Sequence, residues 1–193
     1  MKKIVLASTS PRRREILKRI VIEFEIIAPK YEEELHNKSF SYEIIEQTAK
    51  KKALSILDIT DKDSIIISAD TVVVYNNIIL GKPKDYDDAQ RMLKMLSGVQ
   101  HKVVTAVCIF DCETGREIIK TETSNVTFNV LTNELIKDYI LKFKPYDKAG
   151  SYGIQELNED FVQEISGDYD NIVGLPSNLV KTLLKDAGYS IWL

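Results

Sequence analysis

The chain has 193 residues, of which 44% are hydrophobic and 28% are charged, and this balance excludes a disordered or fibrous protein. Its 26 Lys and Arg residues against 29 Asp and Glu residues give a net charge of −3, which excludes a generally basic protein of the kind that binds nucleic acid polymers. An anionic partner must therefore meet positive charge that is local.

The composition is uniform along the chain, without a linker, an internal repeat or a low-complexity segment, so residues 1–193 are predicted to form one domain. The apolar run after Lys2 and Lys3 is too short for a signal peptide, and no run is long enough to span a membrane. The two cysteines, Cys108 and Cys112, and the two histidines do not have the spacing of a zinc site. We therefore expect a cytoplasmic protein with reduced thiols and no membrane partner.

The first half of the chain alternates predicted strands and helices. Strands are predicted at residues 3–7, at 24–28 and from Ile65 onward, and helices at about 11–20 and 41–57. Ser10 suits the N-cap of the first helix because Pro11 follows it at the first helical position. Asn76-Asn77 predicts a two-residue hairpin loop in which Tyr75 faces Ile78.

The second half continues the alternation. A helix capped by Asp85 is predicted to bury Ala89, Met92, Leu93 and Leu96 and to end at Gly98. Residues 101–110 are almost all apolar or small, which predicts a strand covered on both faces at the centre of a sheet, with a partner at about 117–130. A helix capped by Thr132, a strand at 161–165 and a helix from Pro176 to Gly188 follow. The predicted fold class is α/β with a mixed sheet, because hairpins occur beside crossovers.

A cluster of hydroxyl and guanidinium groups marks the start of the first helix. Ser8, Ser10, Arg12, Arg13 and Arg14 fall within seven residues, although the positive pole of a helix N-terminus disfavours cations. Free backbone N–H groups, hydroxyls and guanidinium forks together suit phosphate oxygens. The alternative, that arginines only keep a surface helix soluble, is the favoured reading for Arg14.

Two charged residues occur where apolar residues are expected. Asp70 lies inside a strand built for burial, where a carboxylate needs a partner, a hydrogen bond or a metal ion. The hairpin brings Lys82 near Asp70, but direct contact requires a bulge or a strand end at Gly81. Lys52 follows Ile45 by seven residues, which is within about 20° of two full helical turns, so it lies on the apolar stripe. A structural pair of Asp70 and Lys82 at a sheet edge remains an alternative.

A segment rich in glycine follows in the last third of the chain. Asp147 to Gln155 contains Gly150 and Gly153, and closely spaced glycines let the backbone approach a ligand. The amide of Gln155 can present a donor and an acceptor to a nucleobase edge. Turn formation alone is the alternative for the glycines. The sequence has no P-loop and no GxGxxG pattern, which removes the usual support for a kinase or a dehydrogenase.

These segments resemble the Maf family of nucleotide pyrophosphatases over nearly the whole length. The resemblance rests on residues 6–13, Ala69 to Val73, Gly81-Lys82-Pro83, Leu96-Ser97-Gly98, Asp147 to Gln155 and Val173 to Pro176. It implies a two-lobed α/β fold with an elongated mixed sheet flanked by helices, similar to inosine triphosphate pyrophosphatases. It also implies a homodimer and hydrolysis of a nucleoside triphosphate to the monophosphate and pyrophosphate, with dTTP and UTP as substrates.

The resemblance assigns roles to particular residues. Asp70 matches the general base, and Ser10, Arg13, Glu33, Lys52 and Lys82 match positions around the phosphates and the metal ion. Arg12, Thr71 and Gln155 match the specificity positions of the branch that acts on dTTP and UTP. Ser8 is expected beside the phosphates from its place before the helix. The expected metal ligands are Asp70 and Glu33, and the expected cofactor is Mg²⁺ or Mn²⁺. A nucleotide-binding regulator of cell division with little turnover is the alternative function.

Overall fold

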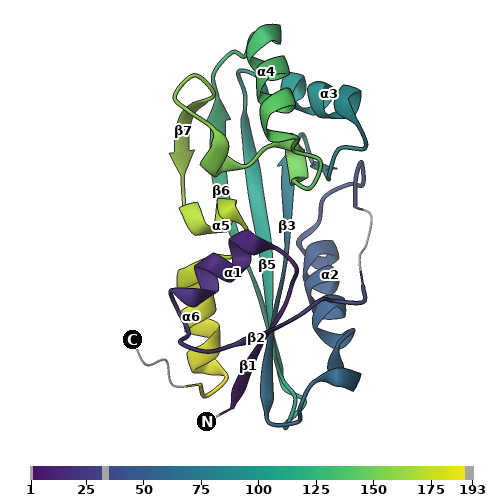
Figure 1. Ribbon diagram of the computed structural model, residues 1–193, viewed down its shortest axis with the longest axis vertical. Coiled ribbons are helices and arrows are strands. Elements are labelled where there is room, and N and C mark those ends of the chain that lie inside the picture. Colours follow the sequence, from purple (N-terminus) through teal and green to yellow (C-terminus); the bar gives the residue numbers. More distant parts are fainter. Residues whose placement is uncertain (1, 32–34, 190–193) are drawn as a thin grey trace.

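A long sheet runs through the computed structural model, which describes residues 2–31 and 35–189 (Figure 1). Its strands within this part of the chain are β1 (Lys3–Ala7), β2 (Glu25–Ile27), β3 (Ser64–Tyr75), β4 (Ile78–Leu80), β5 (Gln100–Asp111), β6 (Glu117–Phe128) and β7 (Val162–Ser166). The order is β2-β1-β3-β5-β6-β7, and β4 pairs with β3. β1 runs parallel to β2 and β3, whereas the other pairs are antiparallel. The predicted α/β fold with a mixed sheet is confirmed.

Helices cover both faces of this sheet. They are α1 (Pro11–Lys18), α2 (Tyr42–Leu54), α3 (Tyr86–Leu96), α4 (Asn133–Phe143), α5 (Tyr169–Val173) and α6 (Ser177–Asp186), with short 3₁₀ turns η1 (Leu57–Ile59), η2 (Ala149–Ser151) and η3 (Ile154–Glu156). Figure 1 shows α3 and α4 near one end of the sheet and α1, α2 and α6 toward the other, which gives the molecule two lobes. None of the described helices is long and apolar enough to cross a membrane.

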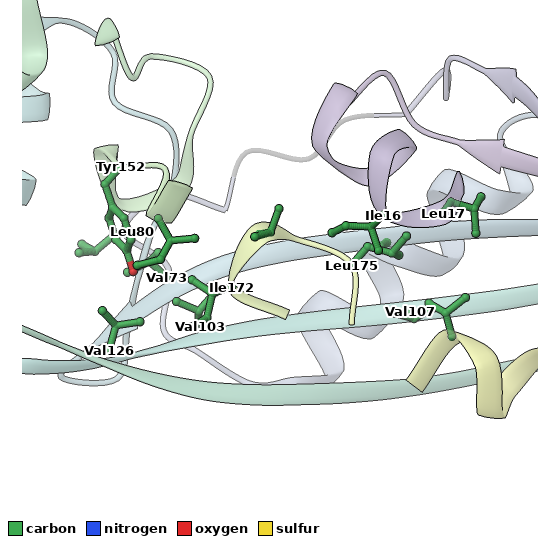
Figure 2. Packing of buried hydrophobic residues seen from close by; sticks show 14 of the residues in the cluster. Ile16, Leu17, Val73, Leu80, Val103, Val107, Val126, Tyr152, Ile172 and Leu175 are labelled. Carbon is green, nitrogen blue, oxygen red and sulfur yellow. The ribbon is translucent and has the colours of Figure 1, made fainter. Parts of the chain in front are cut away.

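The alternation of side chains along β3 divides the hydrophobic core between the two faces. Ile65, Ile67 and Val73 pack with α1, α3, α4 and α6 on one face, and Figure 2 shows part of that cluster. Ile66 and Val74 pack with α2 on the other face. β5 is buried on both faces, as its continuous apolar run predicted, because its side chains pack alternately into the two clusters.

The helix caps agree with the sequence, because caps depend on local hydrogen bonds. Ser10, Ser41, Asp85 and Thr132 each accept a backbone N–H bond at the start of their helix. Four helices end before their predicted ends and are followed by turns: α1 ends at Lys18, α2 at Leu54, α3 at Leu96 and α6 at Asp186. The helix α5 was not predicted.

The predicted hairpin after β3 is confirmed, but it is short. Asn76 and Asn77 have φ angles of 48° and 62°, which a tight two-residue turn of this kind requires, and Tyr75 lies opposite Ile78. β4 ends at Leu80, opposite Val73. Lys82 therefore lies outside the ladder, beyond the strand end at Gly81.

One edge of β3 is interrupted, and this gap positions the site. β1 pairs with β3 at Ser64–Ile67, and β4 pairs with it at Val73–Tyr75. Residues 68–72 lie between these partners, and on this edge no strand of the described chain pairs with them. Beside this gap the chain passes from the carboxyl end of β1 into α1. Open α/β sheets bind ligands at such carboxyl ends of their strands.

A buried histidine predicts how stability depends on pH. His101 is 2% exposed, its Nε2 lies 2.7 Å from the Tyr152 hydroxyl, and burial lowers its pKa from 6.5 to about 4. Because the unfolded chain takes up this proton at higher pH than the folded chain, stability is lost as the pH falls from about 6.5 to about 4. We expect this histidine to account for a loss of about 3 kcal/mol in the free energy of unfolding.

Urea unfolding of wild type and His101→Gln at pH 7 and pH 4 measures this effect. The glutamine keeps an amide beside Tyr152 but does not titrate. The variant should lose about 3 kcal/mol less than wild type on acidification. An equal acid loss in the two proteins would show that His101 is not responsible.

Candidate active site

A cleft of about 920 Å³ opens at the gap in the sheet edge. The predicted site residues that the structure describes all line it, namely Ser8, Ser10, Arg12, Arg13, Lys52, Asp70, Thr71, Lys82 and Gln155. These residues come from α1, α2, β3, η3 and the loops beside them. Glu33, the other expected metal ligand, lies outside the described residues.

Asp70 and Lys52 form a nearly buried ion pair at this cleft. Asp70 lies in β3 on the face covered by α2, and the Lys52 ammonium donates a hydrogen bond to its Oδ1. The two side chains are 12% and 15% exposed. Burial lowers the pKa of Lys52, while the charge of Asp70 opposes this shift. The position of Lys52 on the apolar stripe of its helix is therefore explained by an acidic partner.

Arg13 approaches from the opposite face of β3. Its Nε donates to the carbonyl of Gly174 at 2.8 Å, and its Nη2 donates to the Thr71 hydroxyl at 3.0 Å. Removal from water lowers the pKa of Arg13, and the charge of Asp70 opposes this shift. The two acceptors hold the guanidinium in one orientation, so Thr71 helps to position Arg13 in the cleft. Thr71 also lies 2.9 Å from the Thr105 hydroxyl.

The start of α1 presents hydroxyls more than free backbone N–H groups. The Ser10 hydroxyl accepts from the N–H of Arg13 at 3.4 Å, and the Ser8 hydroxyl accepts from the N–H of Ser10 at 3.2 Å. Pro11 has no N–H. The serine side chains thus already occupy two of the N–H groups that could otherwise bind phosphate oxygens. Arg14 is exposed, as expected of a surface residue.

Lys82 enters the cleft from the strand end after β4. The N–H of Gly81 donates to Nδ1 of His36 at 3.1 Å, and the carbonyl of Gly81 accepts from the N–H of Gly150 at 3.1 Å. Both backbone hydrogen-bonding groups of the residue before Lys82 are therefore fixed. His36 was missed by the sequence reasoning, because its contact with Gly81 joins segments that lie 45 residues apart.

The far wall of the cleft combines a polar rim with an apolar surface. Arg12 Nη1 lies 3.3 Å from Oδ2 of Asp147, and Gln155 is exposed on η3. Val73, Val103, Tyr152, Ile154 and Ile172 supply apolar lining, and Figure 2 shows four of them, all but Ile154, close together.

The glycines of this wall pack against the protein itself. A Cβ on Gly150 would lie 2.8 Å from Cγ2 of Val73, and its φ is +66°. A Cβ on Gly153 would lie 3.0 Å from Cε of Lys148. The expectation that these glycines let the backbone approach a ligand is therefore not supported, because side chains of the same chain fill the space. We expect Gly150 to be required for closure of the wall against β3.

The charges of the cleft suit a compact polyanion. Among the described lining residues, the cations are Arg12, Arg13, Lys52, Lys82 and Lys148, and the carboxylates are Asp70 and Asp147. Cations therefore exceed carboxylates here, although the whole chain carries a net charge of −3. Such local excess raises the concentration of an anionic ligand at the site.

The same residues limit how a metal ion could bind. The described part of the chain brings together no group of three or more His, Cys, Asp or Glu side chains able to hold one. Mg²⁺ commonly takes one or two carboxylates together with substrate phosphates and water. Asp70 fits this mode, in which a divalent cation is shared with a triphosphate.

Residues 3–187 match the family described as Maf-like protein. The chain belongs to the Maf family. A relative from Alkaliphilus oremlandii (strain OhILAs), named dTTP/UTP pyrophosphatase, is 48% identical over 186 residues, which cover 96% of each chain. A relative of the same name from Thermosipho africanus (strain TCF52B) is 48% identical over 187 residues, covering 96% of this chain and 94% of the relative.

A solved structure shares the fold at low sequence identity. The Staphylococcus aureus Ham1 protein matches with a TM-score of 0.54 and 15% identity, covering 96% of this Maf chain and 100% of that chain. At this identity the likeness concerns the fold alone. The elongated sheet flanked by helices is therefore not particular to the Maf sequence.

Proposed function

We propose that this Maf protein hydrolyses nucleoside triphosphates, with dTTP and UTP as preferred substrates, to the monophosphate and pyrophosphate. The observation that carries the proposal is the Asp70–Lys52 pair, placed in a cation-lined cleft with Arg13 facing it across β3. The names of the relatives, dTTP/UTP pyrophosphatase, support the choice of reaction and substrate.

The reaction requires positioning and charge stabilisation more than covalent catalysis. The oxygen of a water molecule forms a bond to the α-phosphorus, and the bond from that phosphorus to the oxygen bridging the α- and β-phosphates breaks. The electron pair leaves with pyrophosphate. Arg13, Lys52 and Lys82 bind the phosphates and stabilise the developing charge. Asp70 orients the water and accepts its proton.

A divalent cation completes the proposed site. Asp70 is the described residue suited to contact Mg²⁺ or Mn²⁺, and Glu33 is the second expected ligand. When bound, the ion neutralises charge on the triphosphate and favours departure of pyrophosphate. The cationic side chains and the hydroxyls of Ser8 and Ser10 hold the substrate independently of the metal ion.

Base selectivity is assigned to Arg12, Thr71 and Gln155. Gln155 presents an amide beside the apolar wall, and Thr71 fixes Arg13. We expect the double variant Gln155→Glu, Thr71→Gln to lower the ratio of kcat/KM for UTP over GTP by about 10- to 100-fold, because the new groups cannot make the same hydrogen bonds. Pyrophosphate release from each triphosphate measures this ratio.

Gln163→Glu is the control for the Gln155→Glu part of this variant, because it makes that change at an exposed position on β7. It should leave the ratio as in wild type. Thermal unfolding confirms that both variants fold. An unchanged ratio in the double variant would mean that Gln155 and Thr71 do not determine which base is accepted.

A pyrophosphate-release assay over the common ribo- and deoxyribonucleoside triphosphates with Mg²⁺ tests the proposed function. Rapid release from dTTP and UTP supports a pyrophosphatase. Tight binding of these nucleotides without release would instead support the regulator of cell division. We further propose a cytoplasmic homodimer, for which fractionation of cells and light scattering of the purified chain are the direct measurements.

A further inference from the structure

A lysine that the proposed mechanism does not use lies nearly buried in the cleft wall. Lys148 is 8% exposed, and its Nζ lies 2.8 Å from Oδ1 of Asp147 and 3.2 Å from Oε1 of Glu156. A cation with this little exposure needs acidic partners to remain charged. Lys148 has two of them, on either side of the η2 turn.

The second of these partners fixes the turn that carries Gln155. Oε2 of Glu156 accepts a hydrogen bond from the Tyr139 hydroxyl at 2.7 Å, and that hydroxyl accepts from the N–H of Gly153 at 3.0 Å. Burial, and then the hydrogen bond to Glu156, raise the pKa of Tyr139, so it remains a donor. The turn from Gly153 to Glu156 is thereby held at both ends.

The packing around Gly153 reinforces this attachment. A Cβ on Gly153 would lie 3.0 Å from Cε of Lys148 and 3.1 Å from Cδ of Glu156. The stem of Lys148 and the carboxylate of Glu156 thus lie directly against the backbone of the turn. A displacement of Lys148 would therefore displace the turn as well.

Gln155 lies between the two fixed ends of the turn. It is exposed, lines the cleft and makes no hydrogen bond to the part of the chain that the structure describes. The backbone of the turn therefore fixes the point from which the Gln155 side chain extends into the cleft. The place where a nucleobase would meet this amide thus depends on the Lys148–Glu156 pair.

Asp147, the first partner of Lys148, also links Lys148 to Arg12 on α1. Oδ2 of Asp147 lies 3.3 Å from Nη1 of Arg12, while Oδ1 of the same carboxylate is held by Lys148. Lys148 is therefore linked to Arg12 through Asp147 and to the Gln155 turn through Glu156. Arg12 and Gln155, two of the residues assigned to base selectivity, lie at the two ends of this network.

We propose that Lys148 is a positioning residue for base selectivity, which fixes the amide of Gln155 relative to the guanidinium of Arg12. This inference rests on the proposed function, because it concerns the nucleotide of that same cleft. Hydrogen bonds to a base edge require donors and acceptors at fixed positions, and a misplacement of about 1 Å can cost about a hundredfold. Loss of Lys148 should lower selectivity between bases before it affects the phosphate site.

The variant must remove the ion pair without leaving a buried charge. In Lys148→Met, Glu156→Gln, the methionine keeps the apolar stem and the amide can still accept from Tyr139. The matched control is Lys2→Met, Asp111→Asn, which removes a lysine–carboxylate pair of 2.6 Å at the end of β5. Neither member of that pair lines the cleft.

Calorimetric titration with the α,β-methylene analogues of UTP and GTP, in the presence of Mg²⁺, tests the inference. These analogues resist cleavage of the bond between the α- and β-phosphates, so the ratio of their dissociation constants reports selectivity without turnover. We expect the ratio to fall by about tenfold or more in the Lys148 double variant. In the control, the ratio should stay within about twofold of wild type, which is the deviation expected of a distant, independent site.

Three results would overturn the inference: an unchanged ratio in the Lys148 double variant, an equal fall in the control, or a wild type that binds both analogues equally. Turnover of UTP by the wild-type protein is measured separately. Selective binding without hydrolysis would contradict the proposed function and leave the role of Lys148 intact. Hydrolysis of UTP together with an unchanged ratio in the variant would support the proposed function and contradict the role of Lys148. With UTP as substrate, the variant should change KM more than kcat.

Discussion

Asp70→Asn is expected to lower the turnover of dTTP and UTP by about a thousandfold, the largest effect of any single change in the cleft. The amide cannot accept the proton of the attacking water, and it removes the negative charge that faces Lys52 and Arg13. Binding of the triphosphate should survive, because the cations remain. Pyrophosphate release at saturating substrate measures the loss.

Asp111→Asn is the matched control, because Asp111 is also a buried carboxylate paired with a lysine. It is 6% exposed and bonds to Lys2 at the other end of the sheet. Both variants should lose stability, since Asp70→Asn takes from Lys52 the carboxylate it bonds to and Asp111→Asn leaves Lys2 with Glu113 alone. Only Asp70→Asn should lose turnover. Comparable turnover in Asp70→Asn and wild type would remove Asp70 from the mechanism.

Lys52→Met is expected to lower kcat/KM for UTP by about a hundredfold, through loss of a cation that is positioned before the substrate arrives. The control is Lys50→Met on the same helix, where the lysine is paired with Glu117 outside the cleft. Because Lys52 and Asp70 act as a pair, the double variant Lys52→Met, Asp70→Asn should be little slower than Asp70→Asn alone. Effects that multiply would mean that the two residues act independently.

The pH dependence gives a second readout for Lys52. Burial lowers its pKa from 10.5, so the ammonium is lost at lower pH than for an ordinary lysine. Activity should therefore fall on the alkaline side below pH 10.5, and Lys52→Arg should move that fall to higher pH, because a guanidinium keeps its proton. A fall at the same pH in both proteins would assign it to another group.

Much of the fold could be predicted because its signals are local. The caps at Ser10 and Asp85, the apolar stripe of α3 and the Asn76-Asn77 turn each depend on residues within one or two turns of the chain. The helix α5 could not be predicted in this way. It has only five residues and depends on the Asp168 cap and on Asn171, whose side chain bonds to the carbonyl of Val103.

The candidate site likewise has some features with a local signal in the sequence and others without one. Lys52 and Asp70 stood out because each interrupts an apolar pattern, and the structure pairs them. The gap in the edge of β3 has no local signal, since it depends on where β1 and β4 stop pairing. The roles of His36 and Lys148 arise from contacts between distant segments for the same reason.

The position of bond cleavage tests the central claim most directly. Hydrolysis of UTP in water enriched in ¹⁸O, followed by mass spectrometry of the products, shows which phosphorus the water attacks. The arrangement of Asp70, Lys52 and Arg13 predicts one ¹⁸O atom in the uridine monophosphate and none in the pyrophosphate. Label in pyrophosphate, or release of labelled orthophosphate, would contradict attack at the α-phosphorus and with it the proposed role of the cleft.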